Sequence, residues 1–169
     1  MCLTDETVET LYLLGEDHRI VGVSGYAVRP PRVRREKPRI SSFISADVPK
    51  ILALAQDLAL TFSDLQADVV RDLVKAGLAV HAFNHRDVEG IYGMIRTVGA
   101  LVGASEKASM LVERLAAGVE RTRAMGAAPP WRPRVYFEEW DEPMICGIHW
   151  VSELIEIAGG QDVFSEKAL

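Results

Sequence analysis

The sequence predicts an α/β fold: a parallel-sheet lobe of strand–helix units, a long interdomain helix, and the start of a second α/β lobe. The first observation is the regular alternation of short apolar runs and helical periodicity between residues 57 and 103. The second is a Gly- and Pro-rich linker at 126–133, after which the pattern restarts. The third is length, because 169 residues bury one good core but hardly two complete domains.

The first elements are a helix and a buried strand. Thr4 or Asp5 can cap a helix that Gly15 ends, because the apolar residues between them keep helical spacing. The run 19–24 is rich in β-branched residues and predicts a short buried strand.

A proline-rich loop follows at residues 29–38. Its three prolines each remove a backbone donor, so this stretch is predicted to be non-helical. A second strand is expected at 39–43. A short helix at 45–54 has Asp47 as its N-cap and Pro49 in its first turn.

The rest of the chain divides into the alternating region, a long helix and a restart. The expected elements are strands 57–62, 78–83 and 134–137, helices 64–76, 87–102, 105–125 and 147–157, and an acidic turn at 138–143. Gly77 and Gly103 are expected to end their helices. We therefore expect a lobe at 1–103, a linker helix at 104–128 and a partial second lobe at 129–169.

The charge distribution excludes some partners. The formal net charge of −5 argues against a nucleic-acid binder, since phosphate affinity needs excess Lys and Arg. The stretch 29–39 nevertheless holds six basic residues and one acid, whereas 138–142 holds four acids around Trp140. Each is by default a solvated loop.

No apolar run approaches the roughly 20 residues of a membrane span, and the N-terminus lacks the basic and apolar segments of a secretory signal.

No set of residues predicts an enzyme or a metal site. The nucleophile-elbow pattern is approached at 22–26 but ends in Tyr26 instead of glycine. His81 and His85 straddle a strand end, so they lack the shared helical face of a zinc pair, and two distant cysteines give no metal or redox spacing. We expect no catalysis and no metal.

Aromatic residues at predicted strand ends are more informative. Tyr26, Phe43, Phe62 and Trp140 each end or follow a strand. Because ligands bind at the carboxyl ends of parallel strands, these rings predict a flat, partly apolar ligand surface. The alternative is that each ring simply covers the end of the sheet.

Six segments, in this order and spacing, resemble the cobalamin- and ferric-siderophore-binding proteins, the class III substrate-binding proteins of ABC importers. They are VGVSGYAVRPP (21–31), KPRISSF (37–43), ILALAQDLAL (51–60), DVEGIYGMIRTVGALVG (87–103), RVYFEEW (134–140) and ELIEIAGG (153–160).

The resemblance implies two lobes joined by a stiff helix, with a corrinoid or ferric chelate bound in the cleft without chemical change. No cofactor is implied beyond that ligand, and the implied partner is an ABC permease at the periplasmic or extracellular face. The ligand-contact residues it suggests are Tyr26, Phe43 and Trp140. We add Phe62, Asp64 and Trp150 as further candidates for ligand contact.

The sequence departs from this family where relatives carry docking glutamates. Pro49 and Ile148 stand at those places, and the nearest acids are Asp47 and Glu153. Two further docking candidates are Arg29 and Arg32. Because the second lobe stops after one strand and one helix, the resemblance also predicts a shortened form that self-associates through the incomplete lobe.

A second interpretation remains open. The lobe is then reused as a cytoplasmic interaction or regulatory module, with the charged stretches 29–39 and 138–142 as docking surfaces. A hydrolase-like enzyme is a third reading, which the lack of a nucleophile–base pair disfavours.

Overall fold

The computed structural model describes residues 1–42 and 45–168, and it divides into two compact units. Unit 1 comprises Met1–Asn84 and Ile95–Ala108, and unit 2 comprises His85–Met94 and Ser109–Leu169. The chain passes from one unit to the other within helices α5 (Val88–Leu101) and α6 (Ser105–Gly126). The domain boundaries expected near residues 103 and 128 stay a prediction.

Unit 1 is built on one parallel sheet. Its strands are β1 (Val23–Ser24), β2 (Arg39–Ser41), β3 (Ala59–Phe62) and β4 (Val80–Phe83). β1 pairs with β2 and β3 pairs with β4, both in parallel. Cys2 joins the two pairs because it bridges Val23 on one side and Leu60 on the other. The order is therefore β2, β1, the segment at Cys2, β3 and β4, which confirms the predicted α/β fold class.

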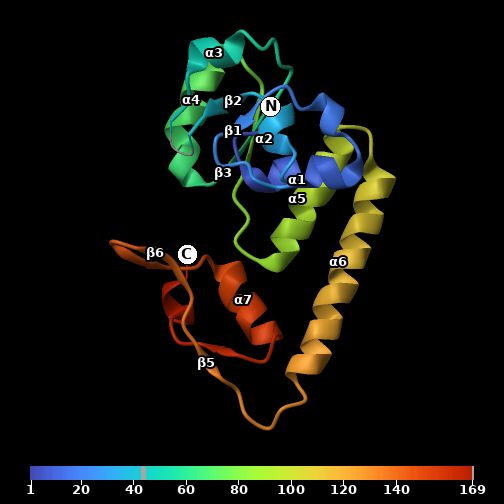
Figure 1. The fold of residues 1–169 in the computed structure, drawn as a ribbon, viewed down its shortest axis with the longest axis vertical. Helices are drawn as coiled ribbons and strands as arrows, with labels where there is room; N and C mark the ends of the chain where they lie inside the picture. The colour runs from blue at the N-terminus through green and yellow to red at the C-terminus, as the bar shows by residue number, and fades with distance from the viewer. Residues whose placement is uncertain (43–44, 169) are drawn as a thin grey trace. The chain divides into compact units, whose positions relative to one another are not determined.

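Helices cover both faces of this sheet (Figure 1). The helices of unit 1 include α1 (Asp5–Leu14), α3 (Val48–Leu52) and α4 (Ala67–Lys75). On one face Leu3 packs with Ile51 of α3 and Leu73 of α4, each of them fully buried. On the other face lie α1 and the carboxyl half of α5. The sheet is therefore the middle layer between two layers of helices (Figure 1).

Local signals set the helix ends as the sequence predicts. Gly15, Gly77 and Gly103 adopt φ of +73°, +85° and +72°, a left-handed conformation that glycine tolerates best. Asp47 accepts the backbone N–H of Lys50 at 3.1 Å and caps α3, whose first turn holds Pro49. Two short 3-10 helices, η1 (Asp17–Arg19) and η2 (Asp64–Gln66), precede β1 and α4.

The proline-rich loop, which the sequence predicts to be non-helical, contains one short helix. Residues Val33–Glu36 form a short helix, α2, so the prediction of a non-helical stretch is wrong there. These four residues lie between the prolines and contain none themselves. Their turn is closed by backbone hydrogen bonds from Glu36 to Arg32 and from Lys37 to Val33.

Unit 2 holds helix α7 (His149–Ile157), the 3-10 helix η3 (Ser165–Lys167) and two small strand pairs. β5 (Arg134–Val135) pairs in parallel with β8 (Gln161–Asp162). β6 (Glu138–Asp141) pairs antiparallel with β7 (Met144–Cys146). The acidic segment predicted as a turn is therefore a strand. Pairing with β7 decides its conformation, and only the two residues between β6 and β7 form the turn.

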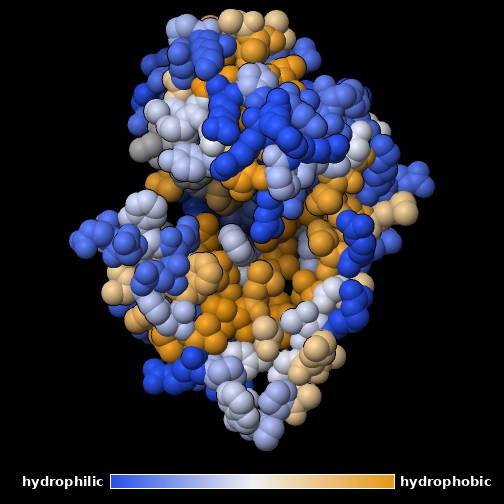
Figure 2. Space-filling model, viewed as in Figure 1, coloured by the Kyte–Doolittle hydropathy of each residue, from blue (hydrophilic) through white to orange (hydrophobic). Residues whose placement is uncertain are grey.

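An apolar groove runs between α6 and α7 in unit 2. Leu115, Val119, Met125, Leu154 and Ile157 line a cavity of about 500 Å³ there. Figure 2 shows hydrophobic residues gathered on the surface of this unit beside the two helices. Among the described residues, no helix combines the length and apolar character needed to cross a membrane.

Candidate functional site

The carboxyl ends of the parallel strands in unit 1 meet at one edge of the sheet. β1 leads there to Tyr26, the segment at Cys2 leads to Thr4, and β3 leads to Ser63 and Asp64. Because neighbouring strands lie about 4.8 Å apart, β1 and β3 are separated by about 10 Å, with one strand between them. Ligands of parallel α/β sheets bind at this edge. It is therefore the candidate functional site of unit 1.

Tyr26 projects from a tight turn that follows β1. Its neighbours Ser24 and Ala27 are each 1% exposed, whereas Tyr26 is 65% exposed. The turn is held by the side chain of Ser24, which accepts the Tyr26 N–H at 3.3 Å, and by its carbonyl, which accepts the Ala27 N–H at 3.1 Å. A large exposed ring on an anchored turn is suited to stacking on a flat or apolar ligand.

The carboxyl group of Glu6, which is half-buried, lies in the first turn of α1, two residues after Thr4. Burial is the main cause that raises its pKa above the usual 4.5, and a hydrogen bond from Thr4 opposes this effect. Thr7 donates its hydroxyl to the carbonyl of Thr4 at 3.2 Å and so ties the first turn together. Sequence reasoning missed Glu6. The available signal was an acid two positions after the cap of a helix that follows directly on a sheet strand.

The end of β3 is held in an unusual conformation. Ser63 has φ of +66°, in the left-handed region that side chains other than glycine rarely adopt, and its hydroxyl accepts the Leu65 N–H at 3.2 Å. Gln66, 1% exposed, accepts the Phe62 N–H at 3.0 Å and donates to the carbonyl of Leu3 at 3.2 Å. This side chain therefore links β3 to the central strand. Strained turns that are held in place by surrounding hydrogen bonds are concentrated at functional sites.

Three of the predicted ligand-contact residues fall on this edge. Tyr26 is exposed, Phe62 is half-buried at the end of β3, and Asp64 is exposed in η2. Phe43 lies outside the described residues. The structure thus places Tyr26, Phe62 and Asp64 at one edge of one sheet, and their contact with a ligand stays a prediction.

The other two predicted residues belong to unit 2. Trp140 lies in β6, is 60% exposed, and donates its indole N–H to the carbonyl of Glu142 at 2.9 Å. Trp150 is half-buried in the first turn of α7. Beside Trp140, the carboxylate of Glu138 accepts the Tyr136 hydroxyl at 2.7 Å, and this bond is the main cause that raises the pKa of Tyr136 to about 12.

The four predicted docking residues have different surroundings. Arg29 lies 3.9 Å from Glu9, and Arg32 lies 3.9 Å from Glu36. The carboxylates of Asp47 and Glu153 both accept backbone N–H groups at helix starts. A permease contact for any of them stays a prediction.

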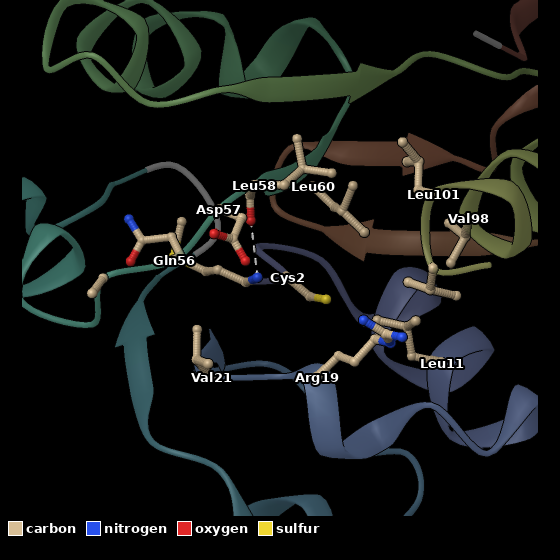
Figure 3. Close-up of a pocket in the computed structure, with 13 residues that line it drawn as sticks. Cys2, Leu11, Arg19, Val21, Gln56, Asp57, Leu58, Leu60, Val98 and Leu101 are labelled. Atoms are coloured by element: carbon tan, nitrogen blue, oxygen red, sulfur yellow. Dashed lines mark hydrogen bonds between the residues drawn. The ribbon is translucent and has the colours of Figure 1, made fainter.

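A separate cavity of about 190 Å³ lies at the opposite, amino ends of the strands (Figure 3). Apolar side chains form much of its lining, among them Leu60, Val98 and Leu101, and the Cys2 sulfur points into it. Burial raises the pKa of the Cys2 thiol. The amino group of Met1 donates to the carbonyl of Leu58 at 3.0 Å beside this cavity. Its position makes it a less suitable ligand site than the carboxyl edge.

No group of three or more His, Cys, Asp or Glu side chains among the described residues is arranged to hold a metal ion. The carboxyl edge instead offers an aromatic ring, hydroxyl groups and carboxyl groups. These groups are of the kinds that take part in stacking and hydrogen bonding at ligand sites.

The sequence as a whole matches a family model described as periplasmic binding protein, over residues 1–168. The chain belongs to the periplasmic binding protein family. This match extends over nearly every residue and thus includes both units. No curated protein sequence matches this periplasmic binding protein chain.

Solved structures share the fold of this periplasmic binding protein. The heme-binding protein RhuT of Roseiflexus sp. RS-1 has a TM-score of 0.85 and 20% identity, with 99% of this chain and 66% of that chain covered. The vitamin B12 binding protein BtuF of Vibrio cholerae has a TM-score of 0.83 with the same identity and coverage. A possible iron-binding protein of Staphylococcus epidermidis ATCC 12228 gives 0.80, 20% identity, and 99% and 67% coverage.

These similarities show that nearly the whole chain shares the fold of the solved structures. The periplasmic binding protein chain spans about two thirds of the length of the solved structures that it matches. The family is described as periplasmic binding proteins, and a further neighbour of the same fold, from Listeria monocytogenes EGD-e, is described as an ABC transporter substrate-binding protein.

Proposed function

We propose that this chain is the ligand-binding component of an ABC-type importer and that its ligand is a flat or bulky metal chelate of the heme, corrinoid or ferric-siderophore class. The observation that carries the proposal is the family match over residues 1–168. Neighbours named as heme-, vitamin B12- and iron-binding proteins support this class of ligand.

We assign the first contact with the ligand to the carboxyl edge of unit 1. Tyr26 offers an exposed ring on an anchored turn, and Asp64 offers a carboxylate for a polar rim of the ligand. An aromatic ring covers the flat face of a macrocycle by stacking, whereas acids and hydroxyl groups bind its polar edges. In unit 2, Trp140 provides a second exposed ring of the same kind.

The proposal is tested by titrating the purified chain with hydroxocobalamin, hemin and ferrichrome while following tryptophan fluorescence and ligand absorbance. We expect saturable binding of one of the three. The Tyr26→Ala variant should weaken it about tenfold or more, the equivalent of roughly 1.4 kcal/mol. Saturable binding of none of them would overturn the assignment.

Two matched variants show what each ring does. Tyr26→Phe keeps the ring and removes only the hydroxyl group, so binding by stacking survives it, while binding through the phenol oxygen is lost. Trp140→Ala should weaken binding, whereas Trp131→Ala should not, although both indoles are comparably exposed, at 60% and 66%. Equal effects of these two tryptophan variants would mean that Trp140 does not contact the ligand.

A further inference from the structure

A second surface of unit 1, distinct from the carboxyl edge, is strongly basic. It consists of side chains on α2 and on the segments either side of it, and we call it the basic face: Arg29, Arg32, Arg34, Arg35, Lys37 and Arg39. All of these residues are exposed except Lys37, which is half-buried. Lys50 of α3 extends it, because its ammonium group donates to the carbonyl of Arg39 at 2.9 Å. Figure 2 shows strongly hydrophilic side chains over α2.

Most of this charge is not neutralised within the protein. Arg29 and Arg32 each lie 3.9 Å from a carboxylate, those of Glu9 and Glu36. Among the described residues, no ion pair involves the other four, Arg34, Arg35, Lys37 and Arg39. The local charge of residues 29–39 is therefore +5, within a chain whose formal net charge is −5. An unneutralised cluster of this size attracts an anionic partner.

The backbone beneath the charges is firmly held. Val33 anchors α2 in the core with no exposed surface. The Tyr12 hydroxyl donates to Glu36 at 2.7 Å, and the Arg32 guanidinium lies 4.8 Å from the centre of the Tyr12 ring. The basic side chains thus project from a fixed support and not from a loose loop.

Their directions favour an extended anionic layer over a single bound anion. At about 100° per residue, Arg32, Arg34 and Arg35 are spread round the circumference of α2 that Val33 leaves exposed. A pocket for one carboxylate or phosphate needs guanidinium groups that converge. Diverging side chains instead match many mobile charges spread over an area, such as lipid headgroups. Val28, 38% exposed, adds an apolar group next to Arg29 that suits a membrane interface.

We propose that the basic face binds the anionic phospholipid headgroups of a membrane surface. The attraction is electrostatic, with each basic residue near such a surface contributing roughly fivefold in affinity. This inference is independent of the ligand assigned above, because it uses neither the chelate nor the permease.

Flotation of the full chain with vesicles tests it directly. We expect the chain to bind vesicles of phosphatidylcholine mixed with phosphatidylglycerol and not to bind vesicles of phosphatidylcholine alone. Binding should fall as salt is added, because the Debye length shrinks from roughly 10 Å at 0.1 M to roughly 3 Å at 1 M. The double variant Arg34→Gln/Arg35→Gln should bind roughly 25-fold more weakly.

The matched control is Arg114→Gln/Arg121→Gln, which removes the same charge from exposed positions of α6 and should bind as the unmodified chain does. Equal losses in the two double variants would overturn the assignment, since net charge alone would explain them. Vesicle binding that persists at high salt would also overturn it. The assignment would likewise be overturned if the chain did not bind vesicles but bound a polyglutamate peptide or duplex DNA through Arg34 and Arg35. The partner would then be an acidic protein or a nucleic acid, not a membrane.

Discussion

The carboxylate of Glu153 in α7 accepts a hydrogen bond from the backbone N–H of Val88, the first residue of α5, at 2.8 Å. The bond joins residues 65 positions apart in the sequence, and both belong to unit 2. Asp87 caps the same helix locally, accepting the Gly90 N–H at 2.7 Å. The start of α5 therefore depends on one cap from its own segment and one from a distant helix.

Replacing Glu153 should loosen that start. Glu153→Ala leaves a part-buried N–H without its acceptor and removes a negative charge from the positive end of the helix dipole, so we expect a loss of about 1–2 kcal/mol in the free energy of unfolding. Urea denaturation measures the loss, and hydrogen exchange at residues 88–91 locates it. Glu156→Ala, on an exposed position of the same helix, is the control and should change stability by less than about 0.5 kcal/mol. Equal losses would contradict the capping role.

Gly126 and Gly159 bring the carboxyl ends of α6 and α7 together, backbone against backbone. A Cβ at Gly126 would lie 2.5 Å from the Ala158 carbonyl carbon, and one at Gly159, where φ is +87°, would lie within van der Waals overlap of Gly126. Gly126→Ala should therefore destabilise unit 2 by about 2 kcal/mol or more, measured by thermal unfolding. Gly118→Ala, in the same helix, meets nothing closer than 3.7 Å and should stabilise the helix by up to about 1 kcal/mol. A neutral Gly126→Ala would show that the helices do not approach so closely.

Local signals predicted the helix ends, whereas distant partners decided what the sequence did not predict. Gly15, Gly77 and Gly103 adopt the left-handed conformation that ends a helix. This signal involves only the last turn of each helix, so it can be predicted from the local sequence. The strand character of 138–141 depends on pairing with β7, and the two-residue strand β8 exists only because it pairs with β5. Neither strand has a periodicity long enough to be read from its own residues.

The candidate site shows the same division. The position of Tyr26 at the carboxyl edge could be predicted, because an aromatic residue closely follows a strand and parallel strands place such residues at one edge. Its contact with a ligand stays a prediction. Gln66 could not be predicted, because its role is to join the ends of two strands, β3 and the segment at Leu3, that are distant in sequence. The role of Glu153 as a helix cap was equally inaccessible, since the sequence gives no indication of which helix start it meets.

Tyr12 links α1 to α2 beneath the basic face. Its hydroxyl donates to Glu36 at 2.7 Å, and this contact follows burial among the causes that raise the pKa of Tyr12 to about 12. Tyr12→Phe should cost about 1–2 kcal/mol in the free energy of unfolding, because the bond to a charged acceptor is lost. The control Tyr26→Phe alters an exposed ring and should have no measurable effect on stability. A Tyr12→Phe variant as stable as the unmodified chain would mean that water replaces the bond at no cost.

Glu6 should make the protein less stable as pH rises. Its pKa is raised in the folded chain, chiefly by burial, from the usual 4.5. Below pH 4.5 the carboxyl is protonated in both the folded and unfolded chains, and Glu6 imposes no penalty. As pH rises through 4.5, the unfolded chain loses the proton first, so folding becomes less favourable until the folded pKa is passed. The penalty is complete once the pH exceeds the pKa of Glu6 in the folded chain.

The Glu6→Gln variant should therefore be more stable than the unmodified chain at pH 7 and equally stable well below pH 4.5. Glutamine keeps an oxygen for the Thr4 hydrogen bond and has no proton to lose in this range. Chemical denaturation at a series of pH values measures the difference. Glu9→Gln serves as the control, because it removes the same charge from α1 at a partly exposed position. It should not show this gain in stability at pH 7. A Glu6→Gln variant that is destabilised at pH 7 would mean that the carboxylate forms favourable contacts outweighing its burial.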